Sequence, residues 1–156
     1  MACQAGNSAD LSRRFAPEDI EGAVPMGEVS WGNAVDEGAQ PGRRGWFIGH
    51  FVARRAGPAA TDLVEVKWGV HAAGEVKTVE GVNQSATTMS LLVSGRFRLV
   101  FPNHGRSVTF VRPGDYAVWS PGVSHRWRVL EDAVVITVRW PSRRGDQSEH
   151  PGDPSR

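Results

Sequence analysis

Eight short runs rich in β-branched and aromatic residues, separated by Gly and Pro turns, constrain the fold of this chain more than any other feature of its sequence. No helical pattern of about ten residues interrupts them, so an α/β fold is not expected. Runs of this kind are typical of a β-sandwich or a barrel. They cover residues 46–53, 62–71, 87–94, 96–101, 106–111, 115–119, 125–130 and 133–140. The sequence therefore predicts an all-β fold, a single-domain jelly roll of two facing sheets, over residues 46–140.

The two flanking segments lack this pattern. Residues 1–40 are rich in Ala, Gly, Asp and Glu with little periodicity, which predicts a mobile or partly docked N-terminal arm. Residues 141–156 contain three Pro, two Gly and no other apolar residue, which predicts a disordered C-terminal tail. His150 lies in this tail and is expected to have no functional role.

The charge and cysteine content argue against several classes of function. A net charge of +1 gives no electrostatic reason to expect a nucleic-acid or membrane partner. The single cysteine, Cys3, cannot form an internal disulfide. No apolar run approaches the roughly 18 residues of a membrane helix, and the N-terminus lacks a basic-then-apolar signal pattern. We therefore expect a cytoplasmic protein whose partner is a small molecule.

A motif between Gly114 and His125 indicates the kind of β fold. It reads Gly-Asp-Tyr-Ala-Val-Trp-Ser-Pro-Gly-Val-Ser-His, and it resembles the second motif of the cupin family, G-x5-P-x-G-x2-H-x3-N. The spacing from glycine to histidine is kept, the proline has moved one place, and Val129 stands where the final Asn is usual. The stretches 66–75 and 86–97 share the resemblance. It implies a cupin jelly roll and a homodimer, but no single reaction, because cupins include oxygenases, isomerases, lyases, cyclases and sugar-binding sensors.

The first cupin motif, which supplies most of the metal ligands in this family, is degenerate in this chain. Placing its last glycine on Gly95 puts Thr88 where a glutamate is usual, and the usual histidine pair falls within residues 81–84, Gly-Val-Asn-Gln. Only His125 remains of the four ligands, whereas transition-metal sites use three or four protein ligands. We therefore expect a pocket without a transition metal or other cofactor. An alternative ligand set stays open, in which His125 is joined by His71, Glu75 and Glu80.

Strand alternation predicts which side chains line the interior of the jelly roll. His125 is the candidate acid or base near neutral pH, and Tyr116 or His71 is its candidate partner in proton transfer. Arg96 and Arg98 are expected on the outer face, because an unpaired buried charge is costly. The candidate ligand-binding residues are Trp127, Thr88, Ser90, Trp68, Val118 and Ser120.

Three functions fit this interpretation. The leading hypothesis is a small-molecule-binding cupin without a transition metal that catalyses proton transfer, as in isomerisation, elimination or cyclisation. The second is a non-catalytic ligand-binding sensor or accessory protein, and the third is a metal-dependent oxygenase with an unusual ligand set. A homodimer is expected in each case, because Met89, Leu91 and Val93 would face away from the pocket and leave an apolar outer surface.

Overall fold

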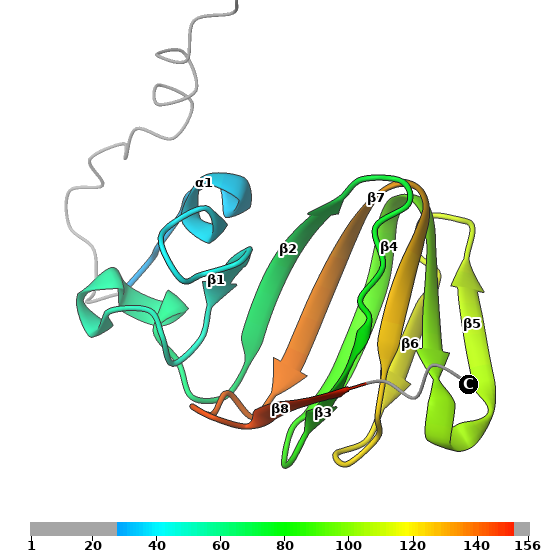
Figure 1. The fold of residues 1–156 in the computed structure, drawn as a ribbon. Coiled ribbons are helices and arrows are strands. Elements are labelled where there is room, and N and C mark those ends of the chain that lie inside the picture. Colours follow the sequence, from blue (N-terminus) through cyan, green and yellow to red (C-terminus); the bar gives the residue numbers. More distant parts are fainter. Residues whose placement is uncertain (1–27, 152–156) are drawn as a thin grey trace, which may run out of the picture.

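The structure, a computed structural model, describes residues 28–151. Most of its regular structure is antiparallel β-strand (Figure 1). The strands are β1 (Trp46–Ile48), β2 (Glu65–His71), β3 (Val79–Asn83), β4 (Thr87–Phe101), β5 (Arg106–Phe110), β6 (Tyr116–Trp119), β7 (Arg126–Trp140) and β8 (Gln147–Pro151). The helical elements are α1 (Ala34–Gly38) and two 3-10 turns, Arg54–Ala59 and Pro102–His104. The prediction of an all-β fold is confirmed.

β4 and β7 are long strands that join the two layers of the fold. Each has 15 residues and merges two runs that the sequence analysis separates. The pairing between them shifts register on both sides of Gly95, whose φ is +83°. A Cβ atom at this position would lie 1.9 Å from the carbonyl oxygen of Asp132. Glycine is therefore required at this bend, both for its backbone conformation and for the close approach of β7.

Two facing layers result from the long strands (Figure 1). One layer has the order β1-β2-β7-β4-β6 and uses the first half of β4 and the second half of β7. The other layer uses their remaining halves and runs from β5 through β4 and β7 to β3 and β8. β3 joins this layer where the N–H of Gly81 donates to the carbonyl of His125 at 2.9 Å and the N–H of His125 donates back at 3.0 Å. The arrangement is the jelly roll that the sequence predicts.

Apolar side chains from β4, β5, β6 and β7 fill much of the space between the layers. The rings of Phe97 and Phe110 stack with their centroids 6.4 Å apart. Phe97 also lies 5.5 Å from the ring of Trp127, so the core borders the more polar pocket described below. The buried core residues are Leu92, Phe97, Leu99, Phe101, Phe110, Trp119, Val129, Ala133 and Val135.

The prediction of a disordered tail is wrong for residues 141–151. β8 pairs with β3 in antiparallel register over Val79–Asn83, and Figure 1 shows the two strands side by side. The segment before β8 is anchored by Asp146, whose carboxylate accepts the backbone N–H groups of Ser85 at 2.8 Å and Ala86 at 3.1 Å. These polar contacts order a segment that has almost no apolar residue of its own. Residues 152–156 lie outside the described residues.

The described part of the predicted arm is docked on the jelly roll. The N–H of Gly45 donates to the carbonyl of Gly38 at the end of α1, at 2.9 Å. A Cβ on Gly38 would lie 2.7 Å from the Cα of Gly45, so the two backbones meet where no side chain fits. Residues 1–27 lie outside the described residues. Within residues 28–151, no helix has both the length and the apolar character that crossing a membrane requires.

Candidate functional site

A small cavity between the two layers is the candidate functional site. Its volume is about 110 Å³, and both layers contribute to its lining. Nine residues are candidates from the sequence, and the structure places five of them around this cavity: His71, Thr88, Ser90, His125 and Trp127. The volume is below the roughly 300 Å³ at which pockets for drug-sized ligands begin, so the cavity suits a small compound.

One wall of the cavity is polar because of the register between β2, β7 and β4. Lys67 pairs directly with Thr137, and Thr137 pairs with Ser90. Thr88 pairs with Arg139 one row further along the sheet. Directly paired residues point to the same face, so all five side chains lie on the cavity side. The hydroxyl oxygens of Ser90 and Thr137 lie 3.3 Å apart, which ties the middle of this wall together.

Aromatic rings form much of the rest of the lining. The ring of His71 lies 4.7 Å from that of Trp127, and the ring of His125 lies 4.8 Å from that of Trp119. Phe97 completes this group beside Trp127. The cavity therefore combines a wall of hydroxyl and cationic groups with a wall of flat apolar surfaces, a composition typical of small-molecule sites.

His125 is buried, and its imidazole is neutral at neutral pH. Its pKa is lowered to about 4, mainly by burial and also by the nearby charges of Lys77 and Arg139, whereas the hydrogen bond to Val123 opposes the shift. Its Nδ1 lies 3.4 Å from the carbonyl oxygen of Val123, which can only accept. Nδ1 therefore carries the proton, and Nε2 keeps a lone pair.

His71 is the second histidine of the cavity. Burial lowers its pKa and the charge of Lys67 acts in the same direction, whereas the hydrogen bond to Glu75 acts against them. Its Nδ1 lies 3.3 Å from the Glu75 carboxylate. A Cβ on Gly69 would lie 2.7 Å from the Nε2 of His71, so glycine at this position leaves space for the ring.

Two cations stand on the polar wall. Burial lowers the pKa of Lys67 to about 8, and the charges of Arg139, Lys77 and Arg44 contribute to the shift. No hydrogen bond or ion pair joins the Lys67 ammonium to another residue of the 28–151 range. Its closest aromatic contact is with Trp46, whose ring centroid lies 5.9 Å from the Nζ.

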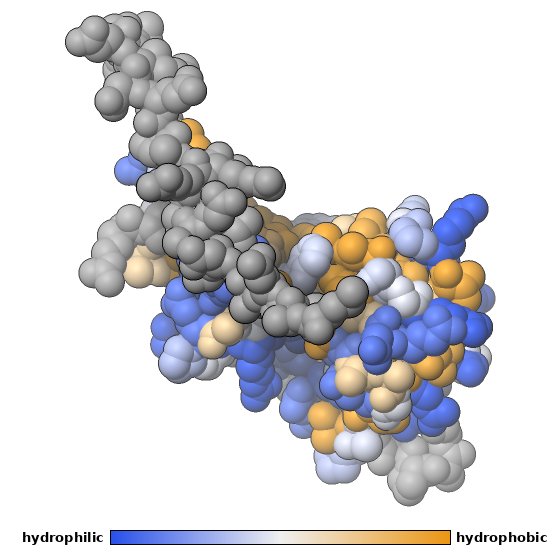
Figure 2. Space-filling model, turned by 90° about the horizontal axis from the view of Figure 1, so that it is seen from above, coloured by the Kyte–Doolittle hydropathy of each residue, from blue (hydrophilic) through white to orange (hydrophobic). Residues whose placement is uncertain are grey.

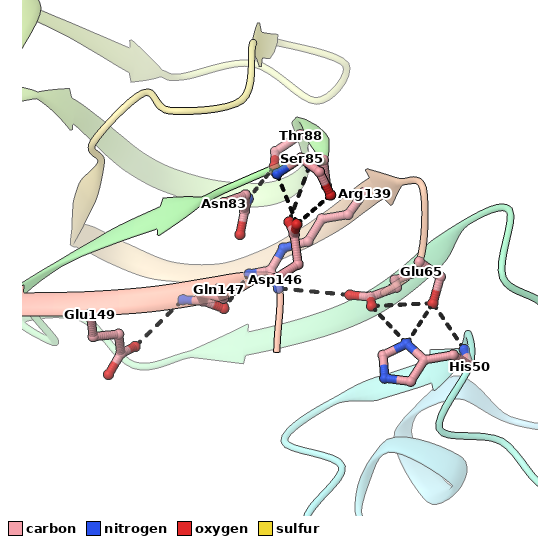
Figure 3. Close-up of polar contacts among 11 residues, drawn as sticks. His50, Glu65, Asn83, Ser85, Thr88, Arg139, Asp146, Gln147 and Glu149 are labelled. Carbon is pink, nitrogen blue, oxygen red and sulfur yellow. Dashed lines mark hydrogen bonds and ion pairs between the residues drawn. The ribbon is translucent and has the colours of Figure 1, made fainter. Parts of the chain in front are cut away.

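Arg139 has partial compensation for its charge. One guanidinium nitrogen lies 3.7 Å from the carboxylate of Glu65, and another donates to the side-chain oxygen of Gln147 at 2.7 Å (Figure 3). The guanidinium also stacks over Trp46, 4.4 Å from the ring centroid. The remaining nitrogen, Nε, is buried and has no hydrogen-bond partner among the described residues.

A second cavity adjoins the first, and two residues of its lining, His50 and Glu65, contact Ser142. It shares Trp46, Arg139 and Gln147 with the first cavity. The Nδ1 of His50 lies 2.7 Å from the hydroxyl of Ser142 and 3.1 Å from the carboxylate of Glu65. In a catalytic triad the serine and the acid use opposite ring nitrogens, whereas both groups meet Nδ1 here. The cluster therefore binds strand ends together and is not a nucleophile with its base.

Four of the predicted ligand-binding or catalytic residues lie outside the cavity. Ala117 and Trp119 of β6 pair with Ser90 and Thr88, which places their side chains on the inner face. The intervening side chains face outward: Tyr116 is 63% exposed and Val118 is 49% exposed. Trp68 pairs with Ile136 on the outer face of the same sheet. Ser120 is exposed in the turn after β6. The four residues are therefore Tyr116, Val118, Ser120 and Trp68.

The residues at the usual cupin ligand positions do not fit a transition metal. The side-chain N–H of Asn83 donates to the hydroxyl of Thr88 at 2.5 Å, and the Oδ1 of Asn83 is buried without a hydrogen-bond partner among the described residues. Glu75 bonds His71, and Glu80 accepts from the hydroxyl of Ser124. Among residues 28–151, no three His, Cys, Asp or Glu side chains lie close enough to hold a metal ion. The alternative ligand set around His125 therefore does not assemble.

Sequence reasoning missed the other residues of the cavity lining, among them Lys67, Trp119 and Arg139. Lys67 shares one face of β2 with Gly69 and His71, because the three residues are two positions apart, so the strand pattern places it on the same face as the candidate His71. Trp119 and Tyr116 lie on opposite faces of β6. Only the pairing of β6 with β4 decides which of the two faces inward. Arg139 ends the inward row of β7 that contains Val135 and Thr137.

No protein-family model and no curated protein matches the chain. Among solved structures, an uncharacterized Klebsiella pneumoniae protein with a double-stranded β-helix domain aligns with a TM-score of 0.51 and 19% identity, over 59% of this chain and 78% of that one. KdgF from Halomonas sp. aligns with a TM-score of 0.46 and 24% identity, over 53% and 74%. A cupin superfamily protein from Desulfitobacterium hafniense aligns with a TM-score of 0.45 and 16% identity, over 51% and 69%. The likeness to the Klebsiella protein shows the fold, a double-stranded β-helix.

Proposed function

We propose that this chain, which has the double-stranded β-helix fold of the cupins, binds a small organic molecule in the cavity between its layers. The observation that carries the proposal is the composition of that cavity. Aromatic rings oppose a wall with three hydroxyl groups and two cations, and a buried neutral imidazole, His125, lies among them. Such a lining offers both apolar contact area and a few fixed polar groups, which is what small-molecule recognition requires.

Filling the cavity tests this proposal. Ser90→Leu adds apolar volume at the centre of the polar wall, and we expect it to weaken the binding of fragment-sized compounds about tenfold or more, because they would lose the space they occupy. The measurement is a ligand-observed NMR screen of compounds of about ten heavy atoms or fewer. Val70→Leu is the matched control, since Val70 is 65% exposed on the same layer. Compounds that bind both variants equally would contradict binding in the cavity.

Proton transfer is the chemistry that the cavity supports best. The free Nε2 lone pair of His125 can accept a proton, and the imidazole of His71, oriented by Glu75, is the second group that can exchange one. Tyr116 takes no part, because it lies on the outer face. A ligand with an acidic C–H or O–H group beside His125 would be the substrate of an isomerisation, elimination or cyclisation.

His125→Gln separates this enzyme from a non-catalytic binder. If His125 is the base, turnover of a substrate found in the screen falls about 10²-fold while binding persists. Turnover by the wild type also falls as the pH drops through about 4, because the imidazole that accepts the proton becomes charged. His104→Gln, in an exposed turn, is the control. Unchanged turnover in His125→Gln would refute the assignment of the base.

A non-catalytic ligand-binding protein is the second candidate function. The observation in its favour is the low pKa of His125, about 4, which makes the imidazole a weak base at neutral pH. In addition, no carboxylate among the described residues lines the cavity to support proton transfer. Binding with no product from any screened ligand would favour this candidate.

We also propose that a second copy of the chain covers the outer face of the layer β2-β7-β4-β6. The face is built from alternate residues of four paired strands and carries no charged side chain, so it offers no complement to a charged partner but fits a copy of itself. The end of the molecule seen in Figure 2 differs, because hydrophilic side chains lie among the hydrophobic ones there. The members of this apolar face are Val66, Trp68, Val70, Met89, Leu91, Val93, Tyr116, Val118, Val134, Ile136 and Val138.

A lysine on this apolar face tests the homodimer. Val118→Lys places a charge among the apolar side chains, and we expect the protein to become a monomer at micromolar concentration, because the charge would be buried without a partner. Val111→Lys is the control, since Val111 is exposed but lies outside the face. Light scattering after gel filtration gives the mass. A wild-type monomer, or an unchanged dimer in Val118→Lys, would contradict the proposal.

A further inference from the structure

We infer that the ligand of the cavity is a small organic anion, whose carboxylate is held between Lys67 and Arg139. The inference rests on the proposed function, since it names the class of molecule that the same cavity binds. The two cations come from adjacent strands: Lys67 of β2 pairs with Thr137, and Arg139 lies two residues further along β7. They therefore occupy neighbouring rows of one inner face: Thr137 and Ser90 lie in the row of Lys67, and Thr88 lies in the row of Arg139.

The charge balance of the cavity lining favours an anion. Three cationic side chains line it, Arg44, Lys67 and Arg139, and no aspartate or glutamate of the described residues does. Three carboxylates outside the lining partly compensate Arg139: Glu65, at 3.7 Å, Asp146 and Glu149. The charged groups that act on Lys67 are the cations Arg139, Lys77 and Arg44, which lower its pKa. His71 also lies near Lys67 and has no negative charge to offer it. A buried cation without a partner is costly, and a bound carboxylate would remove that cost.

Two fully buried hydrogen-bonding atoms of the lining have no partner among the described residues, and both are donors. The Nε of Arg139 and the Nε1 of Trp119 are buried without a hydrogen-bond partner in residues 28–151. The Lys67 ammonium has three N–H donors and only an aromatic ring close to it. A carboxylate accepts through two oxygens and about four lone pairs, so one such group can satisfy several of these donors together. A neutral amide would bring two N–H donors of its own into a site that already has too many.

The opposite wall indicates what the rest of the anion is like. Trp127, Phe97 and Trp119 offer flat apolar surfaces, and the cavity volume of about 110 Å³ limits the ligand to a few heavy atoms beyond its carboxylate. Small monocarboxylates with a short apolar or planar body therefore fit best. A phosphate monoester would need more room than a small monocarboxylate. It also carries a second negative charge, and the only other cation of the described lining, Arg44, is exposed at the edge of the cavity.

The two lysines of the chain make a direct test possible. Only Lys67 and Lys77 occur in the sequence, so protein labelled with 13C at the lysine ε-carbon gives two side-chain signals, assigned with Lys67→Met and Lys77→Met. The probes are acetate and benzoate, their neutral counterparts acetamide and benzamide, inorganic phosphate, and sodium chloride at matched ionic strength. Lys77 is the internal reference, because it lies outside the cavity lining and pairs with Glu149 at 3.0 Å.

We expect acetate or benzoate to shift the Lys67 signal in a saturable way and to raise the pKa of Lys67 above its starting value of about 8. The amides should bind about tenfold more weakly or worse, since they lack the charge. Lys67→Met should weaken carboxylate binding by a similar factor and leave amide binding within about twofold, whereas Lys77→Met should change neither. Phosphate should bind more weakly than the carboxylates.

Each other outcome overturns the inference, and the pattern shows whether the proposed function falls with it. Amides that bind as tightly as the acids, with indole signals of the cavity shifted, would refute anion recognition and leave small-molecule binding in place. Equal shifts of both lysine signals with carboxylates and chloride would mean screening and no site. If neither acids nor amides shift any cavity signal, and the fragment screen finds no compound sensitive to Ser90→Leu, both proposals fail.

Discussion

Replacing Glu65 with alanine is expected to lower the free energy of unfolding by about 3–5 kcal/mol, the cost of removing one partner of a buried ion pair. Glu65 is only 6% exposed. One of its carboxylate oxygens lies 3.1 Å from His50 and accepts from Ser142 at 3.2 Å, and the other lies 3.7 Å from Arg139. Without Glu65, Arg139 would lose its ion pair and keep only the charge interactions with Asp146 and Glu149.

Urea unfolding at pH 7 measures this change. Glu131→Ala is the matched control, because Glu131 forms an exposed pair with Arg96 at 3.3 Å, and exposed pairs contribute about 1 kcal/mol or less. Glu65→Gln should fall between the two, since the amide keeps a hydrogen-bond acceptor for Ser142 but not the charge. A cost below about 1 kcal/mol for Glu65→Ala would show that water compensates Arg139, and that the cavity is wetter than its lining indicates.

The sequence was sufficient to predict the fold and five residues of the cavity lining. In β2, period-two spacing places Lys67, Gly69 and His71 on one face, and in β4 the cupin resemblance puts Thr88 at an inward position, whose face Ser90 shares. The structure places Lys67, His71, Thr88 and Ser90 in the cavity lining. Local alternation fixes which residues share a face, and the resemblance indicated which face of β4 points inward.

β6 shows where this reasoning fails. Both of its alternating sets contain an aromatic residue, so hydrophobicity does not distinguish Tyr116 and Val118 from Ala117 and Trp119. The choice is made by the antiparallel register with β4, in which Thr88 pairs with Trp119. That register is a contact between distant parts of the chain, and a shift of one residue would have exposed Trp119 and buried Tyr116.

β8 and the cations have a related explanation. Gln147–Pro151 is almost entirely polar, and it forms a strand because β3 offers an edge and Arg139 and Ser85 offer hydrogen bonds to the segment. The sequence of the segment alone does not indicate these partners, because they come from other parts of the chain. Lys67 shares a strand face with the candidate residue His71. The general cost of burying an unpaired charge nevertheless argues for lysines on the solvent-exposed face of a strand. Functional sites are where proteins most often depart from this rule, so the inward position of Lys67 makes it a candidate site residue.

Lys67→Met should therefore stabilise the protein while it removes anion binding. In the folded chain the pKa of Lys67 is lowered from 10.5 to about 8 by burial and by its cationic neighbours. The unfolded state thus binds this proton more tightly, and below pH 8 the ammonium opposes folding by about 3.5 kcal/mol at most, at about 1.4 kcal/mol for each unit of pKa. Methionine fills similar space without the charge, so a gain in stability of up to this size is expected at pH 7.

The pH dependence gives the sign of the effect independently. Between pH 8 and about 10.5 the unfolded state holds a proton that the folded state has released, so wild-type stability should rise with pH in this window, and Lys67→Met should abolish the rise. Lys77→Met should keep it, because Lys67 is intact. Urea unfolding at pH 7 and pH 10 measures both variants. A less stable Lys67→Met at pH 7 would mean that the ammonium supports the fold, and the case for a cation held in place for an anionic ligand would then be lost.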